Sequence, residues 1–438
     1  MKNKTHGFIV SLVMILAFTG NVYAASHFIR SGATGANNGN DWTNAWTNLP
    51  TTLVRGDTYY IADGTYASHT FNDNASGTNY IYLKKATVAD HGTSTGWLDS
   101  YGDGQAIFPQ LSFEPAPSGN GGYYDFNGYS AAATQNCGIK VSFGNGQMGI
   151  NFWASGNHPY VKWQYIEAAG PGGAGDYPYL TTPDTQAIWI NGNGAAGDTS
   201  HMLVSHCYIH GVATGMQDSN GNNYMTVEYS NFSDIRSSNS GNHDNIWWMG
   251  SSYGTFRFNK VYNFATEGIF LGGGAHTGVE IYGNVFYDGV GNARGVEFRE
   301  ADSGGPPPFT NIKIYNNTFV DLSTAAVRVM QNCSTSGVEI KNNIIVNSGG
   351  ISLENGGNGV TQANNLTTTT SVFNNYTARD FHLAAATSPG STLPAPYNTD
   401  LDGIIRGADG SWDIGAYEYV AGGGGLTPPA PPKNLRTR

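Results

Sequence analysis

The sequence predicts an all-β fold in which short strands wind into a parallel β-helix with a cap at each end. Composition is the first observation behind this prediction: glycine supplies 60 of the 438 residues, aromatic residues 13% and charged residues only 12%. Helical bundles and coiled coils need more Ala, Glu, Lys and Leu, and disordered chains have few aromatic residues. Many short strands joined by Gly- and Asn-rich turns fit this composition.

An imperfect repeat between about 155 and 375 is the second observation. Each copy has an alternating strand, then an amide or small residue, then one or two more apolar positions, and a second strand follows. The amide or small positions are Gln164, Cys207, Ser230, Asn259, Asn284, Asn317 and Asn343. From Cys207 onward they lie 23 to 33 residues apart, which is too short for the four-stranded blade of a β-propeller. Stacked coils would bury a continuous core, and stacked asparagines would satisfy one another.

The two ends of the chain carry a different kind of signal. Lys2 and Lys4, an apolar run over 8–18 and small residues around Ala24 are typical of a cleaved signal peptide, so we expect an exported protein. No later segment is long and apolar enough for a membrane span. The chain has 21 Lys and Arg against 32 Asp and Glu, and this acidic balance argues against a nucleic-acid partner.

These features divide the chain into five parts. We expect a signal peptide at 1–24, an N-terminal cap with the first coils at 25–110, and the β-helix at 111–376. A C-terminal cap would cover 377–420, and a flexible tail rich in Gly and Pro would follow at 421–438. Caps are needed because the end coils of a solenoid expose strand edges and apolar core.

Three segments resemble known proteins. Residues 55–66 look like an opening coil, and 380–383 together with 413–419 look like a closing segment. With the Asn-containing repeats, they make the chain similar to the secreted right-handed β-helix proteins of the pectate-lyase-like superfamily. The resemblance implies a single right-handed parallel β-helix over most of 27–420. It does not choose a chemistry, because this scaffold carries lyases, hydrolases, epimerases and structural proteins.

Alternation along the second strands sorts their side chains by face. If Ile188, Met216 and Ile246 point inward, the next residue of each coil faces outward. That outward column would be Trp189, Gln217, Trp247, Phe270, Glu297, Arg328 and Ser352. Aromatic rings suit the apolar faces of sugars, so we expect Trp189, Trp247, Phe270 and Arg328 to bind a polysaccharide. The alternative is that a long loop covers the aromatic residues.

A charged column is expected at the edge just before these strands, reading Gln186, Thr214, Asp244, Glu267 and Arg294. Arg299 lies two positions beyond Glu297. Long loops at 168–184, 233–243 and 301–310 would flank the same face, and long loops on a rigid scaffold often carry binding sites. The alternative is a ladder of surface charges without a function.

A lyase acting on uronate-containing polysaccharide is the leading hypothesis. Such an enzyme must neutralise the uronate carboxylate, either through Ca²⁺ held by Asp244 and Glu267 or through arginines, and it needs a base such as His243. The candidate catalytic residues are therefore His243, Asp244, Glu267, Arg294, Glu297 and Arg299. Two alternatives stay open: a non-catalytic surface or matrix adhesin, and a glycoside hydrolase that uses a pair of carboxylates.

The three cysteines add little chemistry. Cys207 falls in an apolar strand pattern and is expected to be a small buried residue, whereas a bridge between Cys137 and Cys333 is left open. No Cys and His spacing typical of a zinc site occurs. The sequence does not predict the oligomeric state.

Overall fold

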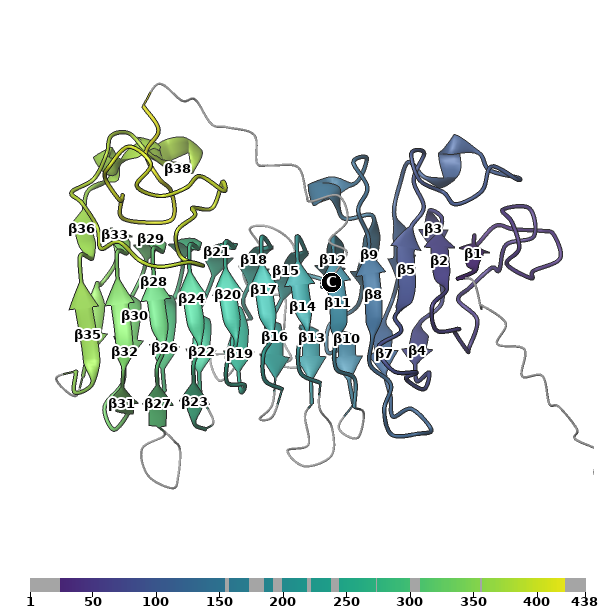
Figure 1. The fold of residues 1–438 in the computed structure, drawn as a ribbon, viewed down its shortest axis with the longest axis horizontal. Helices are drawn as coiled ribbons and strands as arrows, with labels where there is room; N and C mark the ends of the chain where they lie inside the picture. The colour runs from purple at the N-terminus through teal and green to yellow at the C-terminus, as the bar shows by residue number, and fades with distance from the viewer. Residues whose placement is uncertain are drawn as a thin grey trace, which may run out of the picture.

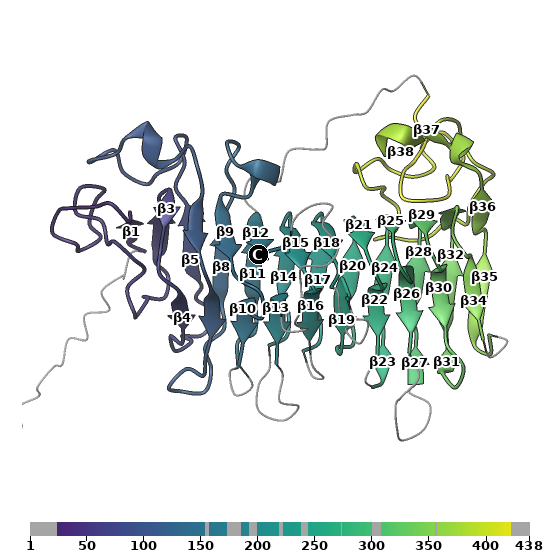
Figure 2. The same cartoon turned by 180° about the vertical axis from the view of Figure 1, so that it is seen from behind.

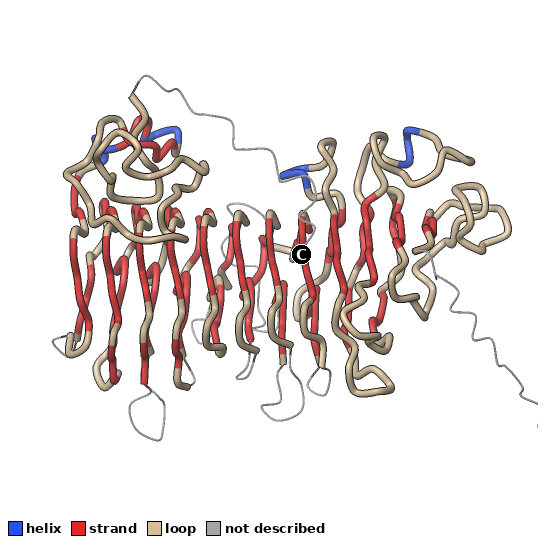
Figure 3. Tube along the Cα trace, viewed as in Figure 1, coloured by secondary structure: helices blue, strands red, loops and turns tan. Residues whose placement is uncertain are grey.

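The computed structural model describes residues 24–153, 157–172, 185–191, 199–218, 222–237, 244–272, 274–299, 308–354 and 357–421. Figures 1 and 3 show one elongated solenoid of stacked coils, built almost entirely of strands. The strands form three long sheets of 12, 11 and 10 strands, and every pairing within them is parallel. The predicted all-β parallel β-helix is therefore confirmed. The predicted signal peptide and tail lie outside the described residues, apart from 24 and 421.

Each complete coil contributes one strand to each sheet, and the sheets are named A, B and C here. Sheet A contains β1 (Ser26–Ile29), β2 (Thr58–Ile61), β5 (Ile81–Lys85), β8 (Tyr124–Asn127), β11 (Val161–Gln164), β14 (Leu203–Ser205), β17 (Thr226–Glu228), β20 (Thr255–Arg257), β24 (Glu280–Tyr282), β28 (Lys313–Tyr315), β32 (Val338–Lys341) and β35 (Val360–Ala363). Sheet B contains β3 (Gly64–Thr65), β6 (Ala106–Phe108), β9 (Ile139–Ser142), β12 (Ile166–Ala169), β15 (Tyr208–Val212), β18 (Asn231–Ile235), β21 (Lys260–Phe264), β25 (Val285–Gly289), β29 (Thr318–Leu322), β33 (Ile344–Val346) and β36 (Leu366–Thr368).

Sheet C carries the second strands of the sequence repeat. It contains β4 (His69–Phe71), β7 (Leu111–Phe113), β10 (Met148–Phe152), β13 (Gln186–Ile190), β16 (Thr214–Asp218), β19 (Trp247–Met249), β22 (Glu267–Leu271), β26 (Arg294–Phe298), β30 (Ala325–Val329) and β34 (Ile351–Leu353). The short strands β23 (His276–Thr277), β27 (Pro308–Thr310) and β31 (Ser334–Ser336) pair on the ridge between sheets C and A. Four short 3₁₀ turns are η1 (Asp99–Tyr101), η2 (Thr134–Asn136), η3 (Thr370–Val372) and η4 (Tyr376–Ala378).

The coil has three strands where the sequence predicted two. The long first strand of the repeat is broken just before the amide position by a residue with positive φ, such as Phe258 (55°) or Asn316 (52°). A left-handed residue turns the chain sharply, so the part before it joins sheet A and the part after it joins sheet B. The repeat was read correctly, but the corner inside it was missed.

A ladder of buried asparagines fixes this corner. The Oδ1 atom of Asn284 accepts from the backbone N–H of Asn259 at 2.9 Å, and that of Asn317 accepts from Asn284 at 3.0 Å. The Oδ1 atom of Asn343 continues the ladder to the backbone N–H of Asn317 at 2.9 Å. Each amide therefore satisfies a main-chain donor of the preceding coil, in a place that water does not reach.

Replacement of Asn317 by Ala should lower the free energy of unfolding by about 2 to 3 kcal/mol, because it orphans the buried N–H of Asn284 and removes further amide bonds. Asn231→Ala is the control, since that side chain lies half-exposed on the outer face of β18. Urea unfolding measures both variants. Equal, small losses would show that the ladder contributes nothing beyond ordinary surface contacts.

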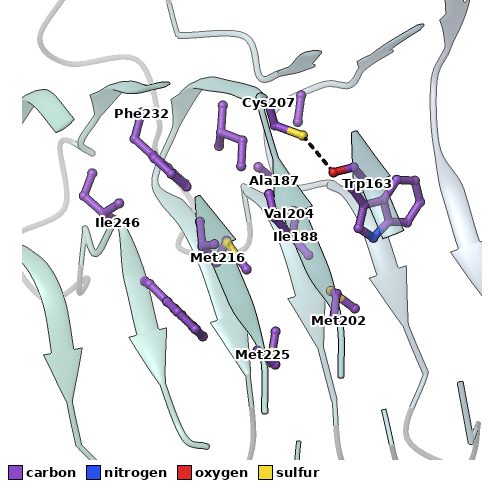
Figure 4. Packing of buried hydrophobic residues seen from close by; sticks show 14 of the residues in the cluster. Trp163, Ala187, Ile188, Met202, Val204, Cys207, Met216, Met225, Phe232 and Ile246 are labelled. Carbon is purple, nitrogen blue, oxygen red and sulfur yellow. Dashed lines mark hydrogen bonds between the residues drawn. The ribbon is translucent and has the colours of Figure 1, made fainter. Parts of the chain in front are cut away.

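The core runs the length of the solenoid and contains mainly Ile, Phe and Val, with fewer Leu, Ala and Met. Figure 4 shows Trp163, Ile188, Met216 and Phe232 packed inside the coils. Cys207 is buried as predicted, 3% exposed, with its Sγ 3.5 Å from the carbonyl oxygen of Trp163. No disulfide joins any of the three cysteines, so the bridge between Cys137 and Cys333 that the sequence leaves open is not formed.

The ends of the described chain pack differently. At the N-terminus, Phe28 and Trp42 form a small apolar cluster. At the C-terminus, the segment that contains β37 (Phe373–Asn375) and β38 (Asp380–Leu383) folds back beside the last coils (Figure 1). Its Tyr397 packs edge-on against Tyr282 at 4.9 Å and Tyr315 at 5.0 Å. Among the described residues, none belongs to a helix that could cross a membrane.

Candidate functional site

The outer face of sheet C carries an aromatic stretch that merges into a cluster of charges. The pairing register places one outward residue of each coil in a single column: Trp189, Gln217, Trp248, Phe270, Glu297, Arg328 and Ser352. Neighbouring strands in a sheet lie about 4.8 Å apart. Residues two dozen positions apart in the sequence therefore become direct neighbours on this face.

The prediction that Trp247 faces outward is wrong. Trp247 pairs with Met216 and Ile269, is fully buried, and its Nε1 donates to Oδ1 of Asp218 at 2.6 Å. Asp218 occupies an inward position of β16, so the core offers the indole N–H the partner that a buried tryptophan needs. Trp248 takes the outward position instead.

The same one-residue shift corrects the charged edge column. Asn245, not Asp244, stands beside Glu267, and its Nδ2 donates to Glu267 Oε2 at 3.0 Å. Asp244 lies one residue earlier and is 3% exposed, and burial raises the pKa of its carboxyl to about 6. Met249, two residues after Trp247 on the same side of β19, is also fully buried.

Two edge-to-face aromatic pairs line the face. Trp153, which is 44% exposed, meets Trp189 with ring centroids 5.6 Å apart. Trp248 meets Phe270 at 5.4 Å. Phe270 itself is only 3% exposed, so its predicted part in substrate binding is corrected: it supports Trp248 and offers little surface to a ligand. Trp153 and Trp189, with Trp248, are the rings that remain as contact surface.

Glu297 is the centre of the charge cluster and is fully buried. Its Oε2 lies 3.0 Å from Arg294 Nε and 3.2 Å from Arg328 Nη1, and its Oε1 lies 3.9 Å from Arg299 Nη1. Two of these arginines reach a second carboxylate, since Arg294 contacts Glu267 at 2.9 Å and Arg328 contacts Glu354 at 2.7 Å. One buried carboxylate therefore holds three guanidinium groups in place.

Opposing effects act on the pKa of Glu297 in this cluster. Burial and the neighbouring Glu267 raise the pKa of Glu297, whereas Arg294 and Arg328 act to lower it. Within the described part of the chain, Glu297 Oε1 accepts no hydrogen bond. Arg299 has the loosest contact of the three arginines and the most exposed side chain, at 35%. It is the cation best placed to meet a ligand from solvent.

Glu267, one of the two predicted Ca²⁺ ligands, already has a partner at each carboxylate oxygen. Both oxygens of Glu267 are already used, Oε1 by Arg294 and Oε2 by Asn245. A cation would have to compete with a guanidinium for the same oxygen atom. No group of three or more His, Cys, Asp or Glu suited to a metal occurs among the described residues. His243 and most of the flanking loop residues lie outside the described ranges.

Sequence reasoning missed three members of this face: Trp153, Trp248 and Asn245. Trp153 follows β10, a strand the repeat did not include. The adjacent tryptophans at 247 and 248 allow two frames, and the sequence contains no local signal that selects one. Asp218 could have indicated the correct frame, since a carboxylate in an inward position needs a buried donor and the Trp247 indole N–H can supply it.

Asp218 also makes stability depend on pH. Burial raises the pKa of its carboxyl from 3.8 to about 7. A raised carboxyl pKa adds stability that is complete below the unfolded value and is lost as pH rises through the folded value. Asp218→Asn keeps an oxygen acceptor for Trp247, so it should remove the part of the stability loss that occurs between about pH 4 and 7. Thermal unfolding of both proteins across this range measures it, and parallel curves would contradict the assignment.

Comparisons with known proteins address the fold. Residues 188–367 match a family described as "Right handed beta helix region". The crystal structure of pectate lyase Pel9A superposes with a TM-score of 0.50 at 15% identity, covering 90% of this chain and 96% of that one. The chain has the pectate-lyase-like fold. The right-handed parallel β-helix implied by the sequence resemblance is thereby confirmed.

Two other solved structures give weaker matches. The PL6 family polysaccharide lyase Pedsa3628 from Pseudopedobacter saltans is 14% identical, with a TM-score of 0.32, over 72% of this chain and 88% of that chain. PfbA, a surface adhesin of Streptococcus pneumoniae, is 10% identical, with a TM-score of 0.29, over 73% and 78%. No curated protein sequence matches the chain. Function therefore has to be argued from the site.

Proposed function

We propose that the outer face of sheet C binds an acidic, uronate-containing polysaccharide and that the protein is an exported polysaccharide lyase. The observation that carries the proposal is the arrangement on this face of the exposed Trp153 and the half-buried Trp189 and Trp248 beside three arginines fixed by one buried glutamate. Export rests on the signal-peptide pattern of residues 1–24.

The tryptophans provide the sugar-binding surface. Trp153 directly follows β10, and Trp189 lies on β13 of the next coil. Trp248 lies on β19, two coils beyond β13. Five strand spacings of about 4.8 Å separate β10 from β26, or roughly 24 Å along the solenoid axis. A long polysaccharide lying along the axis would contact rings at one end and arginines at the other, whereas a short oligosaccharide would reach only part of the face.

The arginines recognise the acidic group. A guanidinium binds a carboxylate through two parallel N–H donors, and it remains charged at any physiological pH. Arg299 has donors to spare because its contact with Glu297 is long. Arg294 and Arg328 are each held by two carboxylates, so they keep the local field positive without moving toward the ligand.

Elimination requires three events at the uronate. A base removes the proton on the carbon next to the carboxylate, the electron pair forms a double bond, and the glycosidic oxygen leaves with a proton. Arg299 would stabilise the negative charge that develops on the carboxylate. Glu297 acts through the arginines and is a positioning residue. His243 stays the predicted base, on a segment outside the described residues.

The test is release of unsaturated uronates, seen by their ultraviolet absorbance, from a panel of pectate, alginate and glycosaminoglycans. Arg299→Ala should lower the rate about a hundredfold or more. Lys162→Ala on sheet A is the control, because that lysine has 34% exposure and a carboxylate partner at 3.3 Å. If the protein bound a polysaccharide but released unsaturated uronates from no polymer of the panel, the lyase proposal would be refuted and the adhesin favoured.

A second candidate reaction is glycoside hydrolysis, favoured by one observation. Glu297 and Glu267 share Arg294, and the pKa of Glu297 is raised, as a general acid requires. Saturated reducing ends without ultraviolet absorbance would identify this reaction. Glu297→Gln would then remove the release of reducing ends.

A further inference from the structure

The two ends of the solenoid are closed differently. At the N-terminal end, the edge of β1 is covered by the chain itself: Phe28 N–H donates to the carbonyl of Gly39 at 3.0 Å, and Trp46 N–H donates to that of Phe28 at 2.9 Å. Trp42 packs under this strap and is fully buried. β1 therefore offers no free strand edge to another molecule. Sheets B and C end here at β3 and β4, and the segment before β2 lies against them: Ala67 N–H, between β3 and β4, donates to Asn48 Oδ1 at 2.8 Å, and Leu49 and Leu53 pack into the core.

In the described part of the chain, the C-terminal end has no such strap. The last coil consists of β34, β35 and β36, each the terminal strand of its sheet. No backbone hydrogen bond joins their outer edges to any residue in the described part of the chain. Figures 1 and 2 both show the C-terminal cap above the last coils and not beyond their end. Three unpaired strand edges therefore face outward together.

Core residues lose their cover at this end. In the penultimate coil, Val327 and Val338 are fully buried. Their partners one coil later, Ile351 and Val360, are only half-buried although they still pack against the main core. The difference arises because no further coil stacks on them. Apolar surface and main-chain groups are thus exposed on the same flat end.

The edge also lacks the usual protection against pairing. Natural edge strands carry lysines, inward charges, prolines or bulges that prevent contact with another chain. The ten strand residues of the last coil contain none of the charged residues and no proline: Ile351, Ser352, Leu353, Val360, Thr361, Gln362, Ala363, Leu366, Thr367 and Thr368. Their side chains are apolar, hydroxyl or amide, which suits pairing with a strand of the same composition.

We propose that two copies of the chain join end to end through their last coils. Because the N-terminal end is closed, each copy has one open edge, so the same edge must meet itself. Such an interface is two-fold symmetric and closes at a dimer, with its strands antiparallel. β35, the longest of the three strands, pairs with β35 of the second copy and brings the two Gln362 side chains near the axis. The last coil supplies about twenty residues a side, as in standard-size interfaces.

Sedimentation velocity of the full chain over a concentration series tests the proposal. We expect a species of twice the mass of one chain and no larger assembly. Gln362 is exposed, so Gln362→Lys and Gln362→Glu should each fold normally yet weaken the dimer on the order of tenfold or more, through like charges at the axis. Mixing the two variants should restore dimers.

Thr255→Lys, on the outer side of β20 in mid-solenoid, is the matched control and should leave the dimer intact. A monomer at every concentration would overturn the proposal, and so would a Gln362→Lys protein that dimerises as well as the control. Hydrogen exchange distinguishes a second copy of the chain from the chain's own tail as the partner of this edge. Protection of the amides at 360–363 in a monomer, independent of concentration, would show that the tail covers the edge and would contradict the proposal. Growing filaments would also contradict it, since they need a second open end.

Discussion

Glu297→Ala should abolish polysaccharide binding and lower the free energy of unfolding by about 3 to 5 kcal/mol. The carboxylate is fully buried and holds Arg294, Arg299 and Arg328. Its removal leaves three cations close together with only Glu267 and Glu354 to balance them. Breaking one partner of a buried ion cluster costs this much because the remaining charges are left uncompensated. Urea unfolding and a binding assay on the same protein measure both effects.

Glu354→Ala is the matched comparison. Glu354 contacts Arg328 at 2.7 Å, but it lies on the exposed rim, so its removal should cost less than about 1 kcal/mol. If Glu297→Ala destabilised the protein no more than Glu354→Ala, Glu297 would not organise the cluster. The positioning role assigned to it would then be wrong.

Trp247→Ala should lower the free energy of unfolding by about 3 to 5 kcal/mol, the range for truncation of a large buried aromatic residue. The change empties part of the core between Met216 and Ile269 and deprives Asp218 of the indole N–H donor. A buried carboxyl that loses its donor is costly in itself. Polysaccharide binding by the folded fraction should be unchanged, because Trp247 does not reach the surface.

Trp248→Ala should show the reverse pattern. This ring lies on the outer face against Phe270, so its truncation should weaken binding and cost much less stability than Trp247→Ala. Comparison of the two variants therefore shows directly which of the two tryptophans faces the core. A large stability loss at Trp248 with a small one at Trp247 would restore the frame that the sequence first suggested.

The fold could be predicted because stacking repeats itself. Every coil must place apolar residues inward, and the later coils place an amide at the corner, so Asn259, Asn284 and Asn317 recur at a spacing that is visible in the sequence. The three-strand coil was missed for a local reason. Residues such as Phe258 and Asn316 adopt positive φ, and an aromatic residue gives no warning of that conformation.

The site was predicted in part, because facing depends on register. Glu267, Arg294, Glu297, Arg299 and Arg328 do meet on one face, as alternation along regular strands requires. The coil at 244–249 broke the rule, since a one-residue slip exchanges inside and outside. There Asp218 and Trp247 form a polar pair within the core, and only a contact between coils could have revealed it.

Affinity electrophoresis through gels that contain acidic polysaccharide tests the central claim most directly. The wild-type chain should be retarded by at least one uronate polymer. Arg299→Ala and Trp189→Ala should each migrate freely, and Lys162→Ala should be retarded like the wild type. If wild type and all three variants ran together in every gel, the outer face of sheet C would not be a polysaccharide-binding surface.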